Sequence, residues 1–304
     1  MQNLNRSKVR IQADILMFIA ALVWGGGFVA QRVATYSLGY FAFNGIRFLM
    51  AALVLLPVGI RFLGKFDRRL WWVVLAGVFL FGGSALQQAG LATTSAGSAG
   101  FITGVYVVLV PFFLAVLFRE KVPLVNWIAA AAALGGTYLL STGGQNIRPS
   151  SGDILELIGA VVWAFHIIVV GKAVKHLNIF TFSVGQFLVC GVLNLILAQI
   201  FTPLSWTSIQ PAIPALLYGG LGSVALGFTL QAVGQSKAPT ADAVLIFSLE
   251  AVFAAIFGAL LLSERMNWVQ VVGCGIIFIS ILSAQFFSAR AEGQQQELEP
   301  TAEE

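Results

Sequence analysis

Residues 14–24 read DILMFIAALVW, and residues 153–163 read DILELIGAVVW. Seven of the eleven positions carry the same residue, at an offset of 139 residues. Chance similarity between two apolar helices is the competing explanation. The shared Asp at the start and the shared Trp at the end are not what chance matches between apolar runs supply. The two stretches therefore indicate an internal repeat.

Two further matches follow in the same order along the chain. LQQAG at residues 86–90 corresponds to LQAVG at residues 230–234, and FREKV at residues 118–122 corresponds to LSERM at residues 262–266. The offset is now 144 residues, so the second half has gained about five residues between the two sets of matches. Because the matches include Gln and Glu, we interpret the chain as two copies of one unit.

The composition is that of a membrane protein. Of 304 residues, 58% are hydrophobic and 10% are charged, and the mean hydropathy is +0.89. A soluble domain carries about 25% charged residues. Ten apolar segments of about 18–24 residues are each long enough to cross a hydrocarbon core of about 30 Å as a helix. Continuous apolar runs exclude a β-barrel, whose strands alternate. The segments are 14–35, 40–62, 70–91, 96–118, 124–141, 153–173, 179–201, 212–235, 239–262 and 268–288.

Five helices in each half make the repeat an inverted one. An odd number of crossings means that the second half enters the membrane from the opposite side. Inverted repeats with a binding site near the midplane are an architecture of secondary transporters. The sequence thus predicts an all-α integral membrane protein, with ten transmembrane helices as two inverted five-helix repeats. The repeats cover residues 14–142 and 152–285, and a disordered cytoplasmic tail covers residues 289–304.

The basic residues predict the orientation of the helices. Thirteen Lys and Arg residues fall on the side of the two termini, and only Arg148 and Arg265 fall on the other. The positive-inside rule then places both termini in the cytoplasm. The net charge of +4 follows from this topology and requires no nucleic-acid partner. The apolar run after Arg6, Lys8 and Arg10 is too long for a signal peptide, so we interpret it as the first transmembrane helix.

Three stretches resemble a known family. They are AALVWGGGFVAQRVA at residues 20–34, FNGIRFLMAALVLLP at residues 43–57 and SLEAVFAAIFGALLLSERM at residues 248–266. With these stretches the chain resembles the EamA family of the drug/metabolite transporter superfamily. The resemblance implies ten helices, two inverted repeats, a central cavity, and export of amino acids or other small metabolites. Family members usually have Pro after the Glu at position 250, where this chain has Ala251.

Glu250 interrupts an otherwise apolar run. It lies twelve residues after Ala238, or about 18 Å of helical rise, which is close to the bilayer midplane. An ionised carboxylate there costs at least a few kcal/mol, so we expect it to face the interior, paired or protonated. We predict a site for a substrate amine or a proton. The alternative is a protonated Glu that links two helices. Tyr106, the repeat equivalent of Glu250, is expected in the same cavity.

His166 also falls near the midplane. Trp163 precedes it by three residues, so both lie on one helix face. Trp24 is the repeat equivalent of Trp163. We expect these three side chains to form a cavity wall, although a lone His is as readily a structural residue bonded to a backbone carbonyl.

Three longer polar side chains complete the predicted binding site. Arg47 contacts a substrate carboxylate, pairs with Glu250, or holds helix ends in place. Gln87 and Gln88 hydrogen-bond either the substrate or a neighbouring helix.

These features predict a secondary active transporter that exports a small metabolite, such as an amino acid, by alternating access. A multidrug or toxic-compound exporter and a passive metabolite channel or uniporter are the alternatives. The expected partners are a small-molecule substrate, the lipid bilayer and protons, and the protein is expected to be a monomer or a homodimer. The expected location is the bacterial inner membrane, as a multi-pass protein.

An enzyme is disfavoured because no His-Glu-x-x-His motif, paired Asp or Ser/His dyad is visible. The sequence contains no Gly-x-x-x-x-Gly-Lys-Ser/Thr motif for binding the phosphates of ATP, which excludes an ATP-driven pump within this chain. Cys190 and Cys274 lie in apolar helices, so we interpret them as small buried side chains. We expect no cofactor and no metal.

Overall fold

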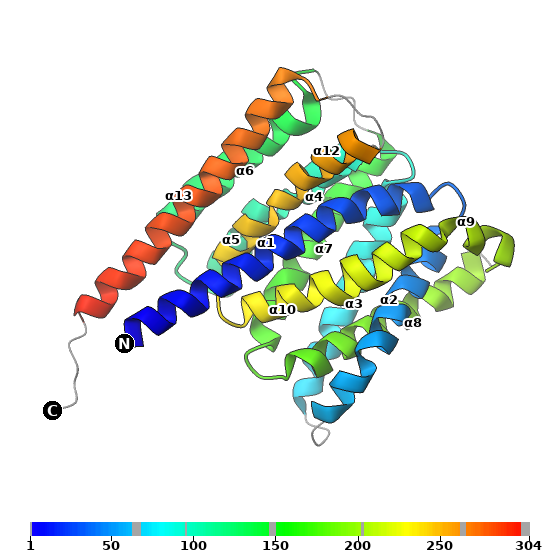
Figure 1. The fold of residues 1–304 in the computed structure, drawn as a ribbon, viewed down its shortest axis with the longest axis horizontal. Helices are drawn as coiled ribbons and strands as arrows, with labels where there is room; N and C mark the ends of the chain where they lie inside the picture. The colour runs from blue at the N-terminus through cyan, green and yellow to red at the C-terminus, as the bar shows by residue number, and fades with distance from the viewer. Residues whose placement is uncertain are drawn as a thin grey trace.

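The computed structural model describes residues 2–62, 68–94, 96–145, 150–201, 204–261 and 266–298. Over these ranges the chain forms packed helices and no strand (Figure 1). The helices are α1 (Gln2–Ala34), α2 (Tyr40–Gly59), η1 (Ile60–Phe62), η2 (Arg68–Leu70), α3 (Trp71–Gly90), α4 (Ala96–Thr103), α5 (Tyr106–Val116), α6 (Leu124–Thr142), α7 (Ser151–Ala173), α8 (Ile179–Phe201), α9 (Trp206–Leu217), η3 (Tyr218–Phe228), α10 (Thr229–Gln235), α11 (Thr240–Phe247), α12 (Leu249–Leu261) and α13 (Trp268–Leu298).

Eight spans in the described part of the chain are long and apolar enough to cross a membrane. Two shorter apolar helices, Leu124–Leu140 and Trp268–Ala284, occupy the places of the other two predicted spans. The class of integral membrane protein is therefore supported, and the count of ten crossings stays a prediction.

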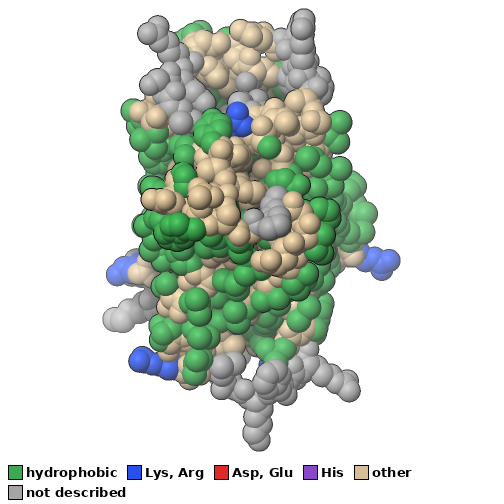
Figure 2. Space-filling model, turned by 90° about the vertical axis from the view of Figure 1, so that its right-hand side faces the viewer, with side chains coloured by type: hydrophobic (Ala, Val, Ile, Leu, Met, Phe, Trp, Pro, Cys, Tyr) green, Lys and Arg blue, Asp and Glu red, His purple; other side chains and the backbone are tan. Residues whose placement is uncertain are grey.

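The outer surface of the bundle is apolar, as a lipid-facing surface must be. Hydrophobic side chains cover most of the flank in Figure 2. Large aliphatic side chains on several helices are more than half exposed, which in water would be a strong aggregation hazard but in lipid is the favourable arrangement. They include Leu53, Ile196, Leu260, Ile279 and Leu282.

Two of the predicted continuous helices are broken. The span predicted over 96–118 is α4 and α5, separated by a turn at Gly104 and Val105. The span predicted over 239–262 is α11 and α12, separated at Ser248, whose Oγ donates to the carbonyl of Leu245 at 2.6 Å. A hydroxyl that bonds a carbonyl of its own helix competes with the backbone ladder there. This second break precedes Glu250 although no Pro is present.

The two breaks fall at corresponding places in the repeat. Helix α4 ends at Thr103 and α11 ends at Phe247, which are 144 residues apart, the same offset as the second set of sequence matches. Tyr106 begins α5, and Glu250 lies in the first turn of α12. Each break thus places one of the two residues that the repeat makes equivalent in the first turn of a new helix.

The span predicted over 212–235 contains a π-helix that the sequence analysis does not anticipate. It begins in α9 and continues through η3, a π-helix, into α10. π-Helices are rare and occur frequently at functional sites. Tyr218, the first residue of η3, donates its hydroxyl to the carbonyl of Val23 at 2.9 Å, so η3 is held directly against α1.

Glycines allow the helices to approach closely. Helix α6 packs along α13, and α1 packs on α12. A Cβ at Gly136 would lie 2.8 Å from the carbonyl oxygen of Gly273, and a Cβ at Gly25 would lie 2.3 Å from the Cβ of Phe253. Small residues at such crossings are the usual means by which membrane helices gain van der Waals contact.

Helix α13 extends further than the sequence analysis expects. Disorder is predicted from residue 289, but α13 is helical to Leu298, and residues 299–304 lie outside the described residues. The segment AEGQQQEL contains mostly good helix formers and continues a helix that is already nucleated, which explains the difference.

The crossing of α1 and α12 gives a stability prediction. Gly25→Ala places a methyl group against the backbone and Cβ of α12, and we expect it to lower the free energy of unfolding by about 1–3 kcal/mol. Gly135→Ala is the matched control, because no described atom outside the neighbouring stretch of its own helix lies within 4 Å of the added Cβ. Thermal unfolding in detergent micelles measures both variants. Equal midpoints for the two variants would contradict the close crossing.

Candidate functional site

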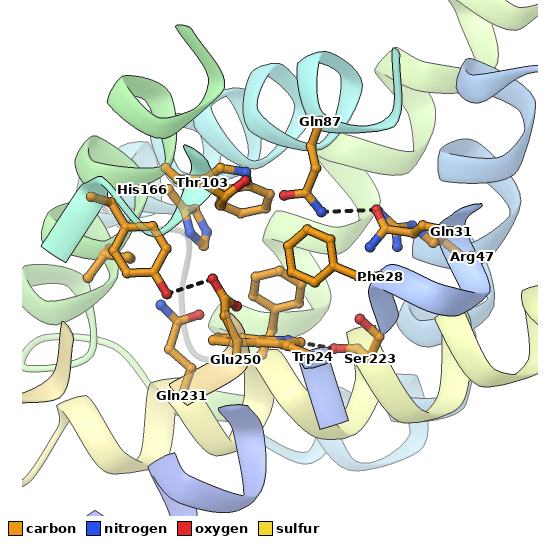
Figure 3. Close-up of a pocket in the computed structure, with 14 residues that line it drawn as sticks. Trp24, Phe28, Gln31, Arg47, Gln87, Thr103, His166, Ser223, Gln231 and Glu250 are labelled. Atoms are coloured by element: carbon orange, nitrogen blue, oxygen red, sulfur yellow. Dashed lines mark hydrogen bonds between the residues drawn. The ribbon is translucent and has the colours of Figure 1, made fainter. Parts of the chain in front are cut away.

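A cavity between the helices gathers polar and aromatic side chains from both halves of the sequence (Figure 3). It contains about 500 Å³ of space not filled by atoms, including its opening. Helices α1, α2, α3, α4, α5, α7, η3, α10 and α12 supply the wall. The lining residues are Trp24, Phe28, Gln31, Arg47, Gln87, Thr103, Tyr106, Trp163, His166, Ile167, Ser223, Phe228, Gln231 and Glu250.

One side of the cavity is acidic. The Tyr106 hydroxyl donates to Oε1 of Glu250 at 2.7 Å, and both residues are buried. Glu250 lies in the first turn of α12, where the helix dipole favours a negative charge. Among the described residues no Lys, Arg or His forms an ion pair with this carboxylate.

Another side of the cavity is cationic. Arg47 is 3% exposed, and its Nη2 donates to Oε1 of Gln31 at 3.3 Å. The same oxygen accepts from Nε2 of Gln87 at 3.1 Å. The guanidinium lies 5.0 Å from the ring centroids of both Phe43 and Phe48, within range of a cation–π contact.

The guanidinium is not neutralised. Within the described part of the chain, Arg47 has no acidic partner, and its Nε has no hydrogen-bond partner. The pairing of Arg47 with Glu250, one of the predicted roles of Arg47, is not formed, and the two side chains lie on different sides of the space in Figure 3. The site therefore contains a buried carboxyl group and a buried guanidinium that do not pair with each other.

Aromatic rings form the wall around these charges. Trp163 stacks on Phe228 with centroids 5.9 Å apart, and Trp24 contacts Phe228 at 5.0 Å. Trp24 also donates its indole N–H to the carbonyl of Ser223 at 3.0 Å, which fixes the ring.

Each tryptophan lies over a glycine, and these glycines also correspond in the repeat. A Cβ at Gly227 would lie 2.5 Å from Nε1 of Trp24, and a Cβ at Gly83 would lie 2.9 Å from ring atoms of Trp163. The two glycines are 144 residues apart, and the two tryptophans are 139 residues apart. Any side chain at either glycine would push an indole into the cavity.

Several side chains that line the cavity carry buried polar atoms without a protein partner. Within the described residues they include both amide atoms of Gln231, Nε1 of Trp163 and Nδ1 of His166. Nε2 of His166 lies 3.0 Å from Oε1 of Gln186. Buried polar groups are normally hydrogen-bonded, and a ligand is one explanation for a group of exceptions.

Seven of the eight predicted site residues line the cavity. The exception is Gln88, which is fully buried and donates its side-chain amide to the carbonyl of Gln31 at 3.0 Å. It therefore holds α3 against α1, the interhelical alternative. Whether the other seven bind substrate stays a prediction.

Sequence reasoning misses several lining residues. Phe28 and Gln31 follow Trp24 by four and seven residues, and Ile167 follows Trp163 by four. This spacing places them on the same helix face as the tryptophan before them, so helical periodicity could have identified them. Of the other four lining residues, Gln231 lies in the repeated LQAVG stretch. The other three, Thr103, Ser223 and Phe228, lie at the ends or in the middle of the broken helices, where a continuous-helix prediction gives the wrong face.

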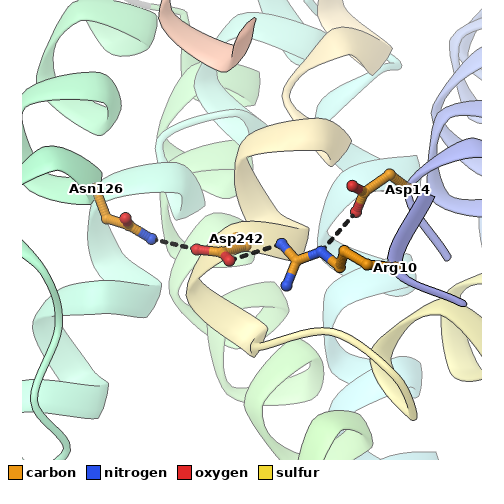
Figure 4. A network of polar contacts seen from close by, with 4 residues as sticks. All are labelled: Arg10, Asp14, Asn126 and Asp242. Atoms are coloured by element: carbon orange, nitrogen blue, oxygen red, sulfur yellow. Dashed lines mark hydrogen bonds and ion pairs between the residues drawn. The ribbon is translucent and has the colours of Figure 1, made fainter. Parts of the chain in front are cut away.

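A second polar network lies near the N-terminus (Figure 4). Arg10 pairs with Asp14 at 3.2 Å on its own helix and with Asp242 at 2.7 Å on α11. The side-chain amide of Asn126 donates to the other oxygen of Asp242 at 2.6 Å. The network ties α1, α11 and α6 together and includes no residue of the cavity wall.

No metal site is found within the described residues. In that part of the chain no group of three or more His, Cys, Asp and Glu side chains lies close enough together to hold an ion.

The sequence matches a known protein family and several of its relatives. The model of the EamA-like transporter family matches twice, over residues 11–142 and 150–284. An uncharacterized transporter of Archaeoglobus fulgidus is 31% identical over 274 residues, covering 90% of this chain and 85% of the relative. The uncharacterized inner membrane transporter YedA of Escherichia coli is 30% identical over 156 residues, covering 49% of this chain and 50% of that protein.

A solved crystal structure shares the fold. It superposes with a TM-score of 0.76 over 92% of this chain and 98% of that chain, at 19% sequence identity.

The network at the start of α1 gives a second stability prediction. Asp242→Asn keeps the shape of the side chain but removes its charge, so we expect a loss of about 1.5–3 kcal/mol in the free energy of unfolding. The control is Glu120→Gln, which breaks the more exposed pair with Lys172, 2.7 Å long, and should change stability by less than about 0.5 kcal/mol. Denaturation in micelles compares the two, and a loss for Glu120→Gln as large as for Asp242→Asn would contradict a structural role for the network.

Proposed function

Because the chain belongs to the EamA-like transporter family, we propose that this membrane transporter exports a small zwitterionic metabolite through the cavity at Glu250 and Arg47. An amino acid is the simplest such compound. The transport is secondary active and works by alternating access, and it involves no catalysis.

The observation that carries the proposal is the buried carboxyl group of Glu250 and the buried guanidinium of Arg47, which do not pair with each other. Removing one charge from water costs several kcal/mol even after relaxation of the protein. Glu250 and Arg47 carry that cost on different sides of one cavity. A zwitterion offsets this cost on both sides, because its ammonium group binds the carboxylate of Glu250 and its carboxylate binds the guanidinium of Arg47. A substrate with one charge would leave the other side uncompensated.

The rest of the wall fits the remainder of such a molecule. Trp24, Trp163, Phe28 and Phe228 surround the space with aromatic rings, which favour an apolar or aromatic side chain. The free amide of Gln231 can donate to and accept from the substrate.

The arrangement of the helices supports alternating access. Helix α2 packs along α8 and α6 along α13, and each pair joins helices that the repeat makes equivalent. Tyr106 and Glu250, which are also equivalent, are hydrogen-bonded to each other in the cavity wall. A two-fold relation between the halves accounts for such contacts. Discontinuous helices with their N-termini at the site are a feature of transporters that move one half against the other.

The topology and location follow from the charge bias and the family. We propose that both termini lie in the cytoplasm and that the protein resides in the bacterial inner membrane.

A second candidate is export of apolar cations, the multidrug alternative. It is favoured by one observation, the placement of an unpaired carboxylate among aromatic rings. This candidate gives Arg47 no role, and that distinguishes the two.

The test is a comparison of metabolites in the culture medium of cells that overexpress the transporter or its variants. We expect a zwitterionic compound to accumulate with the wild type and to fall at least about thirtyfold with Glu250→Gln and with Arg47→Gln, because each removes a buried charged contact worth about 2–5 kcal/mol. Glu120→Gln is the matched control for loss of a carboxylate outside the cavity.

Each alternative gives its own result. If a cationic compound accumulates with the wild type and with Arg47→Gln but not with Glu250→Gln, the substrate is an apolar cation and not a zwitterion. Export of a compound unchanged in both charge variants, with folded protein in the membrane, would overturn the assignment of the cavity.

A further inference from the structure

A second buried carboxylate lies behind the cavity wall. Glu156, on α7, is fully buried. Its Oε2 accepts a hydrogen bond at 3.0 Å from the hydroxyl of Thr103, and Thr103 itself lines the cavity. Among the described residues, Oε1 of Glu156 has no hydrogen-bond partner. Gly90 packs directly against it, since a Cβ there would lie 2.8 Å from both Cγ and Oε1.

The charged groups around Glu156 do not compensate it. Asp153 on its own helix and Glu250 on α12 are close enough to act on it electrostatically, and both are acidic. Tyr106 on α5 bonds Glu250, and Arg32 on α1 donates to the carbonyl of Leu91 at the end of α3. No cationic group in the described part of the chain pairs with Glu156.

An ionised carboxylate in this position is strongly unfavourable. It would be a buried charge without a counter-ion, near two other carboxyl groups. One added proton removes the charge, and Oε1, the oxygen without a hydrogen-bond partner among the described residues, is the atom that binds it. The asymmetry of the two oxygens thus indicates a group that gains and loses a proton.

From this geometry we propose that Glu156 is a proton-binding site, reached from the cavity past Thr103, that carries the coupling ion while Glu250 holds the substrate. The proton binds Oε1, the carboxylate becomes a neutral acid, and on release the proton passes to water on the side to which the cavity is open. The Thr103 hydroxyl keeps its own hydrogen throughout. The coupling role rests on the proposed function, whereas proton binding at Glu156 does not.

Infrared difference spectroscopy between low and high pH tests the site on the full-length protein in lipid nanodiscs, without a substrate. We expect a carboxylic-acid C=O band that is present at low pH and lost as the pH is raised. Glu156→Gln should remove this band. Glu250→Gln and Glu120→Gln should leave it in place, which also separates the two buried carboxyl groups.

Thr103→Val provides a second variant in which the carboxyl group is retained. It removes the only hydrogen bond to Glu156 found within the described residues, and this bond stabilises the charged form. The band should then persist at a pH at which the wild type has lost it. This result holds even if Glu156→Gln does not fold.

Three results would overturn the proposal. A pH-dependent band unaffected by Glu156→Gln would assign the proton to another residue. A Glu156 band present over the whole pH range would make the group a permanently neutral structural link. Loss of the band at constant pH when choline chloride is replaced by sodium chloride would make this a sodium site.

The outcome does not depend on the export experiment. If export required Glu250 and Arg47 but Glu156 did not titrate, the proposed function would stand and only the coupling site would be wrong. If Glu156 titrated but the charge variants exported normally, the reverse would hold.

Discussion

A carboxyl group and a guanidinium are buried in one cavity without pairing, and the surrounding structure keeps them apart. Oε1 of Glu250 is held by Tyr106, and Arg47 is held by Gln31 and by the faces of two phenylalanine rings. If the two side chains met, they would form a neutral pair with little affinity for a charged substrate. Their separation keeps both charges available, and the low-dielectric surroundings make each strong.

The broken helices provide this arrangement. A break begins a new helix, and the dipole at the first turn of a helix favours an anion. The break at Ser248 puts Glu250 in such a turn, and the break at Gly104 brings Tyr106 to face it. Glycines beneath Trp24 and Trp163 then bring the aromatic walls close.

Much of this can be predicted from the sequence. The apolar runs locate the helices, and a carboxylate or a guanidinium inside a run stands out because burying it is costly. The spacing of the repeat alone makes Tyr106 equivalent to Glu250 and Trp24 equivalent to Trp163. The parts that cannot be predicted depend on tertiary contacts. The break at Ser248 lacks the expected Pro, the π-helix depends on packing against α1, and Gln88 points to a backbone carbonyl instead of the cavity. Glu156 is inconspicuous because it follows Asp153 near the start of a helix, where acidic residues are common caps.

The most direct measurement is counterflow into proteoliposomes that contain the purified transporter. Phenylalanine, its methyl ester and N-acetylphenylalanine serve as probes, because they present both charges, the cation alone and the anion alone. Two complementary buried charges predict that an excess of internal phenylalanine drives uptake of labelled phenylalanine, and that neither derivative replaces it. Equal counterflow with the methyl ester, or no counterflow with any zwitterionic amino acid, would contradict binding between Glu250 and Arg47.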